Sequence, residues 1–187
     1  MQLWNKLNKE ELEEQLRDIG HEFMTISFYQ YAQIANPRLF RDHLFIIWSN
    51  LDVVGRTYIA SEGINAQIAV PTKNISQFRE ELYQIDFLNG IRLNLAIDET
   101  EAEFAFLKLK IKVRDKILAD GLNDKTFDVT KKGKHLNAEE FNTLTNDPET
   151  LLIDFRNHYE SEVGYFEGAI LPDVDTFRDS LPKIEEE

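Results

Sequence analysis

Residues 24–97 alternate between strand-like and helix-like patterns, and this alternation limits the folds open to the chain more than any other feature. Two segments, 37–49 and 76–85, repeat apolar residues at helical spacing. Four segments rich in β-branched and aromatic residues indicate strands: 24–34, 53–60, 66–70 and 91–97. The order predicts an α+β ferredoxin-like domain (βαββαβ), with a four-stranded antiparallel sheet and two helices on one face.

Two further elements flank this predicted core. Residues 9–19 predict an amphipathic helix, because their apolar residues share one face and Asn8 with Glu11 forms a capping-box pattern. Residues 106–114 predict an additional strand in which apolar and basic side chains alternate, so that the basic ones share one face. We call these basic side chains the basic row: Lys108, Lys110, Lys112 and Arg114.

The charge of the chain bears on what the basic row can bind. A net charge of −13 argues against nucleic acid as a partner, because phosphate binding needs concentrated positive charge. Residues 104–134, however, hold nine Lys and Arg against four acidic residues.

Successive side chains of the basic row lie about 6.5 Å apart, which suits phosphate contacts. The alternative is a solvated edge strand whose lysines discourage aggregation. Arg56 and Lys73 are candidates to extend the surface.

The segment SEGIN (61–65) joins two predicted strands, and Gly63 supplies the positive φ that a tight connection needs. Glu62 and Asn65 are candidate substrate contacts of this hairpin. The alternative is a turn whose polar side chains bond to the backbone. Both readings stay open on the sequence alone.

Aromatic residues gather in the first predicted strand. Their alternation assigns them mostly to the core, and stacking on a nucleic-acid base is the alternative. The residues concerned are Phe23, Phe28, Tyr29 and Tyr31.

Several chemistries are excluded by composition. The chain has no cysteine, so it offers no disulfide, thiolate metal ligand or thiol nucleophile. His21, His43 and His135 show no metal-ligand spacing, and no metal site is expected. No stretch approaches the ~20 apolar residues of a membrane span, and the N-terminus lacks the pattern of a secretory signal. A cytoplasmic protein with no membrane partner is therefore expected.

A second unit is predicted toward the C-terminus. Residues 119–133 are rich in turn-forming and charged residues and indicate a linker between domains 1–118 and 134–187. Asn137 and Glu140 form another capping-box pattern, and LLIDF (151–155) is an apolar run typical of a central parallel strand. A further helix from about Tyr159 indicates the start of an α/β domain.

Asp154 and Arg156 end this predicted strand, and His158 follows them. An Asp-Arg pair at a strand end is often structural and holds neighbouring loops together. His158 is either a proton carrier or a solvent-facing residue at a helix start.

Four separated blocks carry a resemblance to a known family. The blocks are SFYQYAQIANP, GRTYIASEGINAQIAVP, LKIKVRDKILADG and IDFRNHYESEVGYFEGAILPDVDTFRDSLP. The last of them matches the opening of a rhodanese domain, with its Asp-x-Arg and Gly-Ala positions. Together, and in this order, they resemble the bacterial rhodanese-related tRNA uridine hydroxylases. The resemblance implies an acylphosphatase-like N-terminal domain followed by an incomplete rhodanese-like domain.

The resemblance implies a function for the full-length protein. Family members convert the wobble uridine of tRNA to 5-hydroxyuridine with molecular oxygen as co-substrate; no cofactor is evident, and the electron donor is unknown. The expected partner is the anticodon stem-loop, with the basic row as its phosphate contact. The family's active cysteine lies on a loop that no residue of this chain matches. Asp154 and Arg156 are then supports for that loop.

The missing loop leads to three expectations for this chain. The chain is expected to be truncated before the active cysteine and to have no catalytic residue of its own. It is therefore expected to be inactive but able to bind tRNA. Its apolar strand edges are open to self-association through the incomplete rhodanese unit. The alternatives for the parent protein are a persulfide sulfurtransferase and a non-catalytic binding module.

Overall fold

The computed structural model describes residues 7–19, 22–96, 105–118, 128, 131 and 133–186. The chain divides into two compact units, Met1–Ile117 (unit 1) and Leu118–Glu187 (unit 2), and each is described by itself. None of the described helices has the length and apolar character that a membrane crossing requires.

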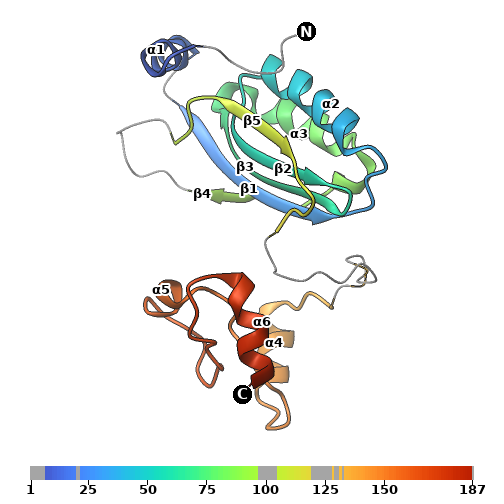
Figure 1. Ribbon diagram of the computed structural model, residues 1–187, viewed down its shortest axis with the longest axis vertical. Helices are drawn as coiled ribbons and strands as arrows, with labels where there is room; N and C mark the ends of the chain where they lie inside the picture. Colours follow the sequence, from blue (N-terminus) through green and yellow to red (C-terminus); the bar gives the residue numbers. More distant parts are fainter. Residues whose placement is uncertain are drawn as a thin grey trace. The chain divides into compact units, whose positions relative to one another are not determined.

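Unit 1 is built on one five-stranded sheet (Figure 1). The strands are β1 (Phe23–Tyr31), β2 (Val54–Ala60), β3 (Gly63–Pro71), β4 (Asn94–Ala96) and β5 (Leu109–Val113). Their order across the sheet is β4-β1-β3-β2-β5. The first four strands pair antiparallel, which confirms the predicted ferredoxin-like arrangement. The sheet is nevertheless mixed, because β5 pairs parallel with β2 at the edge.

Helices α2 (Pro37–Asn50) and α3 (Ile75–Tyr83) lie together on one face of this sheet (Figure 1). Helix α2 begins where expected, because Pro37 occupies its first turn and the Asn36 side chain accepts a hydrogen bond from the Leu39 amide. Short 3₁₀ turns precede and follow α3, at Thr72–Asn74 and Asp86–Leu88.

The main core fills the space between the sheet and these two helices. Trp48 from α2 is 1% exposed, and its ring lies 5.7 Å from that of Phe78 and 6.4 Å from that of Phe28. Ile26 and Phe28 on β1 both point into this core, so the residues between them face the other side of the sheet.

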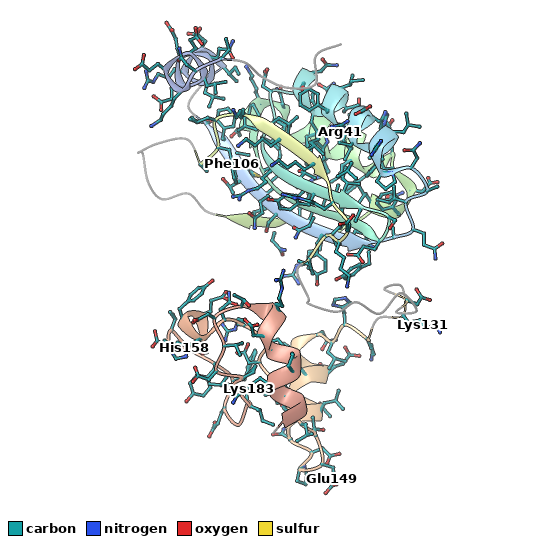
Figure 2. All side chains as sticks on the ribbon, viewed as in Figure 1. Arg41, Phe106, Lys131, Glu149, His158 and Lys183 are labelled. Atoms are coloured by element: carbon teal, nitrogen blue, oxygen red, sulfur yellow. The ribbon has the colours of Figure 1, made fainter. Side chains whose placement is uncertain are left out.

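A second, smaller cluster covers one end of the opposite face. Helix α1 (Lys9–Ile19) packs Leu16 against Val54 and Ala69, and Phe106 joins them. Phe106 lies at the end of the sheet nearest α1 (Figure 2). Helix α1 therefore shields only part of the face that α2 and α3 leave open.

The connection between β2 and β3 is shorter than the predicted SEGIN loop. Only Ser61 and Glu62 form the turn, and β3 already begins at Gly63. Gly63 has a φ of 149°, and a Cβ atom there would lie 2.1 Å from the Gln30 carbonyl oxygen. The close approach of β1 therefore requires glycine at this position.

Unit 2 contains helices α4 (Ala138–Thr145), α5 (His158–Ser161) and α6 (Phe177–Glu186). The capping box predicted for α4 is present, with Asn137 and Glu140 exchanging hydrogen bonds.

The prediction of a strand over 151–155 is wrong in extent. This segment forms a single parallel bridge, between Ile153 and Ile170, and Leu151 is 78% exposed. An apolar run becomes a strand only where a neighbour pairs along its length, and the described residues provide one bridge. The rhodanese-like fold of unit 2 stays a prediction.

Candidate nucleic-acid interface

Strand β5 forms the edge of the sheet and contains two of the four residues of the basic row, and the other two flank it. Ile111 is 6% exposed and belongs to the main core, whereas Lys110, Lys112 and Arg114 are exposed. Lys108 lies just before the strand and is half-buried. The alternation of the sequence thus anchors the strand through its apolar side and holds its cations in solvent.

The sheet register extends this positive charge onto β2. Arg56 is the pairing partner of Lys110, and Tyr58 is the partner of Lys112. The Arg114 guanidinium carbon lies 5.5 Å from the centre of the Tyr58 ring, within the range of a cation–π contact. Within the described residues, neither Lys110 nor Lys112 forms an ion pair, so both charges are available to a ligand.

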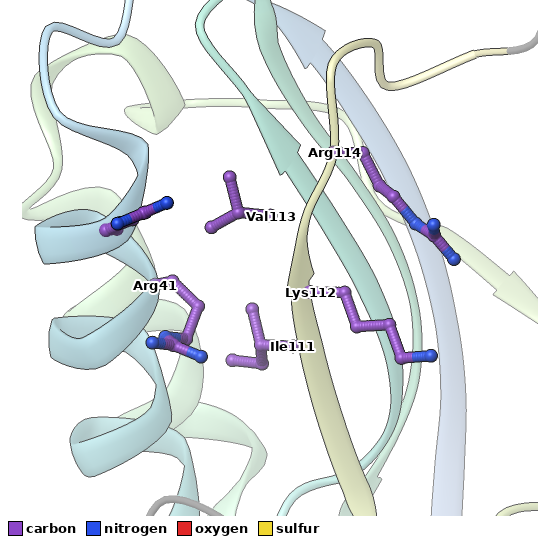
Figure 3. Close-up of a pocket in the computed structure, with 6 residues that line it drawn as sticks. Arg41, Ile111, Lys112, Val113 and Arg114 are labelled. Carbon is purple, nitrogen blue, oxygen red and sulfur yellow. The ribbon is translucent and has the colours of Figure 1, made fainter.

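The other side of β5 borders a pocket of about 450 Å³ against α2. Its lining consists of Arg38, Arg41, Ile111, Lys112, Val113 and Arg114. Ile111 and Val113 point toward α2, and Lys112 and Arg114 point away from it (Figure 3). Arg41 is paired with Asp42 beside it. Cationic side chains therefore flank β5 on both sides, an arrangement suited to binding phosphate oxygens.

The five strands contain no acidic residue at all, although the chain has a net charge of −13. Their charged residues are Arg56, Lys110 and Lys112. The local charge of the sheet is thus opposite to that of the whole chain, and it matches a polyanionic ligand.

Of the two candidate extensions, Arg56 joins the basic row and Lys73 does not. The ammonium group of Lys73 donates to the Ile19 carbonyl oxygen at 3.1 Å, at the C-terminal end of α1. Such a contact satisfies a carbonyl that the helix leaves without an internal partner.

The hairpin residues Glu62 and Asn65 both contact the peptide of Ile117, a pair of bonds we call the Ile117 clamp. The Ile117 amide donates to Glu62 Oε1 at 2.8 Å, and Asn65 Nδ2 donates to the Ile117 carbonyl oxygen at 3.3 Å. The Arg114 amide also donates to the Ile59 carbonyl oxygen at 2.8 Å. These bonds fix the chain where it leaves β5 and so hold the cations of the strand in place. Direct substrate contact by Glu62 or Asn65 stays a prediction.

Tyr29 is a surface residue among the four aromatic residues that the sequence assigns mostly to the core. Phe28 is 2% exposed, as expected, but Tyr29 is 52% exposed. Successive side chains of a strand point to opposite faces of the sheet, so the burial of Phe28 places Tyr29 on the other face. The packing of the helices decides which face of the sheet is covered, and the sequence of the strand alone does not indicate that face.

In unit 2, Asp154 and Arg156 form a close ion pair. Arg156 Nη2 lies 2.6 Å from Asp154 Oδ2 and also donates to the Gly164 carbonyl oxygen at 2.7 Å. The hydrogen bonds from Arg156 hold the pKa of Asp154 below its ordinary value, and the bonds to Asp154 raise the pKa of Arg156. The pair ties the end of the 151–155 segment to a loop eight residues further on.

His158 begins α5 with a half-exposed side chain (Figure 2). Its Nδ1 lies 2.9 Å from Asp173 Oδ1, and its Nε2 lies 3.2 Å from Glu162 Oε1. Two carboxylates and one imidazole do not make a metal site here. Among the described residues, no group of three or more His, Asp or Glu side chains is placed to hold a metal ion.

Comparison with known proteins gives consistent matches over nearly the whole chain. Residues 23–117 match the family described as UPF0176 acylphosphatase like domain, a range that begins at the first residue of β1 and ends at Ile117. Proteins named tRNA uridine(34) hydroxylase from Escherichia coli O17:K52:H18 (strain UMN026 / ExPEC) and Photorhabdus laumondii are each 46% identical over 185 residues. A protein of the same name from Salmonella heidelberg (strain SL476) is 45% identical. Each alignment covers 98% of this chain and 52% of the relative, so the chain spans about half the length of these relatives.

Proposed function

Because the chain belongs to the tRNA uridine(34) hydroxylase family, whose UPF0176 acylphosphatase-like N-terminal domain it contains, we propose that the protein modifies tRNA at the wobble uridine. The product is 5-hydroxyuridine, and molecular oxygen is the co-substrate. The observation that carries the proposal is the 46% identity over 98% of the chain to relatives named for this reaction. The site of action is the cytoplasm, where the tRNA substrate is found.

Unit 1 has the role of docking the tRNA. Its support is the acid-free sheet with exposed cations on β5 and the arginine-lined pocket beside it. Lys110 and Lys112 contact phosphates of the anticodon stem-loop, because exposed cations on a rigid strand bind phosphate without reorganising. The Ile117 clamp keeps this strand in position.

The hydroxylation itself requires residues that this chain does not contain. The family resemblance assigns the reaction to a cysteine, and the chain has none. Asp154 and Arg156 support the loop that carries it, by holding the preceding segment to Gly164. The chain alone therefore binds tRNA without converting uridine.

Mass spectrometry of tRNA nucleosides tests the proposal. A strain lacking the gene is expected to lose 5-hydroxyuridine at the wobble position, and the full-length gene to restore it. Restoration by a gene that carries Lys110→Gln and Lys112→Gln should be incomplete. Unchanged 5-hydroxyuridine in the deletion strain would contradict the proposed activity. Formation of 5-hydroxyuridine by the purified chain in the presence of oxygen would contradict the assignment of the reaction to residues outside it.

A further inference from the structure

The sheet of unit 1 has a face that the helices of the main core do not cover. Residues that face α2 and α3 alternate along each strand with residues that face the other way. We call the part of the second set that the α1 cluster does not include the open face, and we use these members of it: Ser27, Tyr29, Tyr31, Arg56, Tyr58, Asn65, Gln67, Lys110 and Lys112. Helix α1 and Phe106 close it at one end, and the Ile117 clamp closes it at the hairpin end.

The strand register aligns these side chains in rows across the sheet. Tyr29 pairs with Asn65, Asn65 with Tyr58, and Tyr58 with Lys112. Because neighbouring strands lie about 4.8 Å apart, this row extends over roughly 14 Å. The next row runs from Ser27 through Gln67 and Arg56 to Lys110. Both rows thus start with a neutral residue on β1 and end with a lysine on β5.

Tyr29 supplies an aromatic ring at the neutral end of its row. It is 52% exposed, and its ring meets that of Tyr31 edge to face, with the centroids 6.2 Å apart. This contact supports the ring of Tyr29 from one side and leaves half of its surface in solvent. At the other end, the Arg114 guanidinium lies over the ring of Tyr58. Both a tyrosine ring and a stacked guanidinium plane are surfaces on which bases stack.

The charge of the open face favours a nucleic acid over an acidic or apolar protein segment. Arg56, Lys110 and Lys112 are its charged residues, and none of the strands contains an acid. Acids lie outside the strands, with Glu22 directly before β1 and Asp52 two residues before β2. Glu62 is bound to the Ile117 amide, and Asp115 follows β5 as an exposed residue.

We infer that the open face is a stacking platform for unpaired bases of an RNA loop, with Tyr29 as its principal stacking residue. Bases lie on the ring of Tyr29 and on the Arg114 guanidinium that covers Tyr58, and their phosphates reach Lys110, Lys112 and Arg56. A sheet with exposed aromatic and basic residues reads single-stranded rather than duplex RNA, because only unpaired bases expose their faces. The inference rests on the proposed function, since it states which part of a tRNA the sheet would contact.

The test compares two RNAs that carry the same number of phosphates, a stem-loop and a blunt duplex. The whole chain and its Tyr29→Ala variant are titrated with each RNA at several salt concentrations. Tyr29→Ala should weaken stem-loop binding roughly 5- to 100-fold, the usual effect of removing one stacking residue, and leave duplex binding unchanged. Tyr29→Phe keeps the ring and should bind as the unaltered chain does. Tyr159→Ala removes a tyrosine of unit 2 that is 59% exposed and serves as the matched control.

The outcomes separate this inference from the proposed function. Binding of both RNAs by the unaltered chain, with no selective loss in Tyr29→Ala, would overturn the platform and leave phosphate docking intact. No binding of either RNA would overturn both. Dimerisation of the chain that Tyr29→Ala abolishes, without an effect on RNA, would assign the face to a second copy and overturn the platform. Thermal unfolding of Tyr29→Ala verifies that its fold is retained, as expected for a half-exposed side chain.

Discussion

The two units hold their structure together by different means. Among the side chains whose exposure the structure describes, the buried aliphatic and aromatic ones lie in unit 1, from Leu12 to Ile117. In unit 2, the buried residues within this described set are Pro172 and three polar ones, Asp154, Ser161 and Ser180. Unit 1 therefore depends mainly on the hydrophobic effect, whereas the buried Asp154 and Ser161 of unit 2 are held by hydrogen bonds to Arg156 and to the His158 carbonyl oxygen. Unit 1 is the better scaffold for a surface that binds a charged ligand, because its apolar core is stable without the charges on that surface.

The largest expected effect comes from removing the centre of the unit 1 core. Trp48→Ala should lower the free energy of unfolding by about 3–5 kcal/mol, because it leaves a cavity between α2 and the sheet. Urea unfolding followed by circular dichroism measures the loss. Leu151→Ala in unit 2 is the contrasting change, since Leu151 is 78% exposed and should cost at most about 0.5 kcal/mol. Similar losses from the two changes would refute the distinction between the units.

A smaller effect is expected from the polar contacts of unit 2. Asp154→Asn should destabilise this unit by about 1–3 kcal/mol, because it removes charged hydrogen bonds from Arg156. Faster hydrogen exchange at the Arg156 amide, which donates to Asp154 Oδ1, would report the loss. Asp175→Asn makes the same change at an exposed position and is the control. Equal exchange rates in both variants would show that the pair is not a structural contact.

The stability of unit 2 should also depend on pH through Asp154. The pKa of this carboxyl is lowered in the folded state, because Arg156 bonds to its ionised form. Its contribution is complete above the ordinary value of 3.8 and is lost as the pH falls through the lower folded-state value. The stability difference between the unaltered chain and Asp154→Asn should therefore shrink on acidification below 3.8. A difference that stays constant would mean that the charge of Asp154 is not the source of the effect.

Local sequence patterns predicted the helices and strands of unit 1 well. The hydrophobic period, the helix-capping residues and the helix-breaking residues all indicate the same elements. Helix α1 has the bounds that its apolar spacing indicated, and the Asn36-Pro37 pair marks the start of α2. The parallel pairing of β5 with β2 is a tertiary feature, which no pattern within β5 encodes. LLIDF shows the opposite case, since its apolar run has the composition of a buried strand and the described residues give it one bridge.

The candidate interface was only partly accessible to sequence reasoning. The basic row follows from the alternation within one strand, and the structure places Lys110 and Lys112 in solvent together. The Ile117 clamp joins residues more than 50 positions apart, so no local motif indicates it. The alternation of aromatic residues in β1 assigns them mostly to the core, whereas the exposure of Tyr29 depends on how far α1 extends over the sheet.

The smallest effect on stability is expected for the change that should most affect binding. Lys110→Gln with Lys112→Gln removes two exposed charges from β5 and should alter the free energy of unfolding by less than about 0.5 kcal/mol. For a single-stranded RNA loop, the slope of log affinity against log salt should decrease in magnitude by about 1.4, or 0.7 for each lost phosphate contact. Lys9→Gln with Arg79→Gln removes the same charge from two helices and should leave the slope close to its original value. An equal change of slope in both double variants would mean that RNA senses only the net charge of unit 1. A large loss of stability in the β5 variant would mean that Lys110 and Lys112 stabilise the fold. The apolar core and the binding surface of unit 1 would then not be independent of each other.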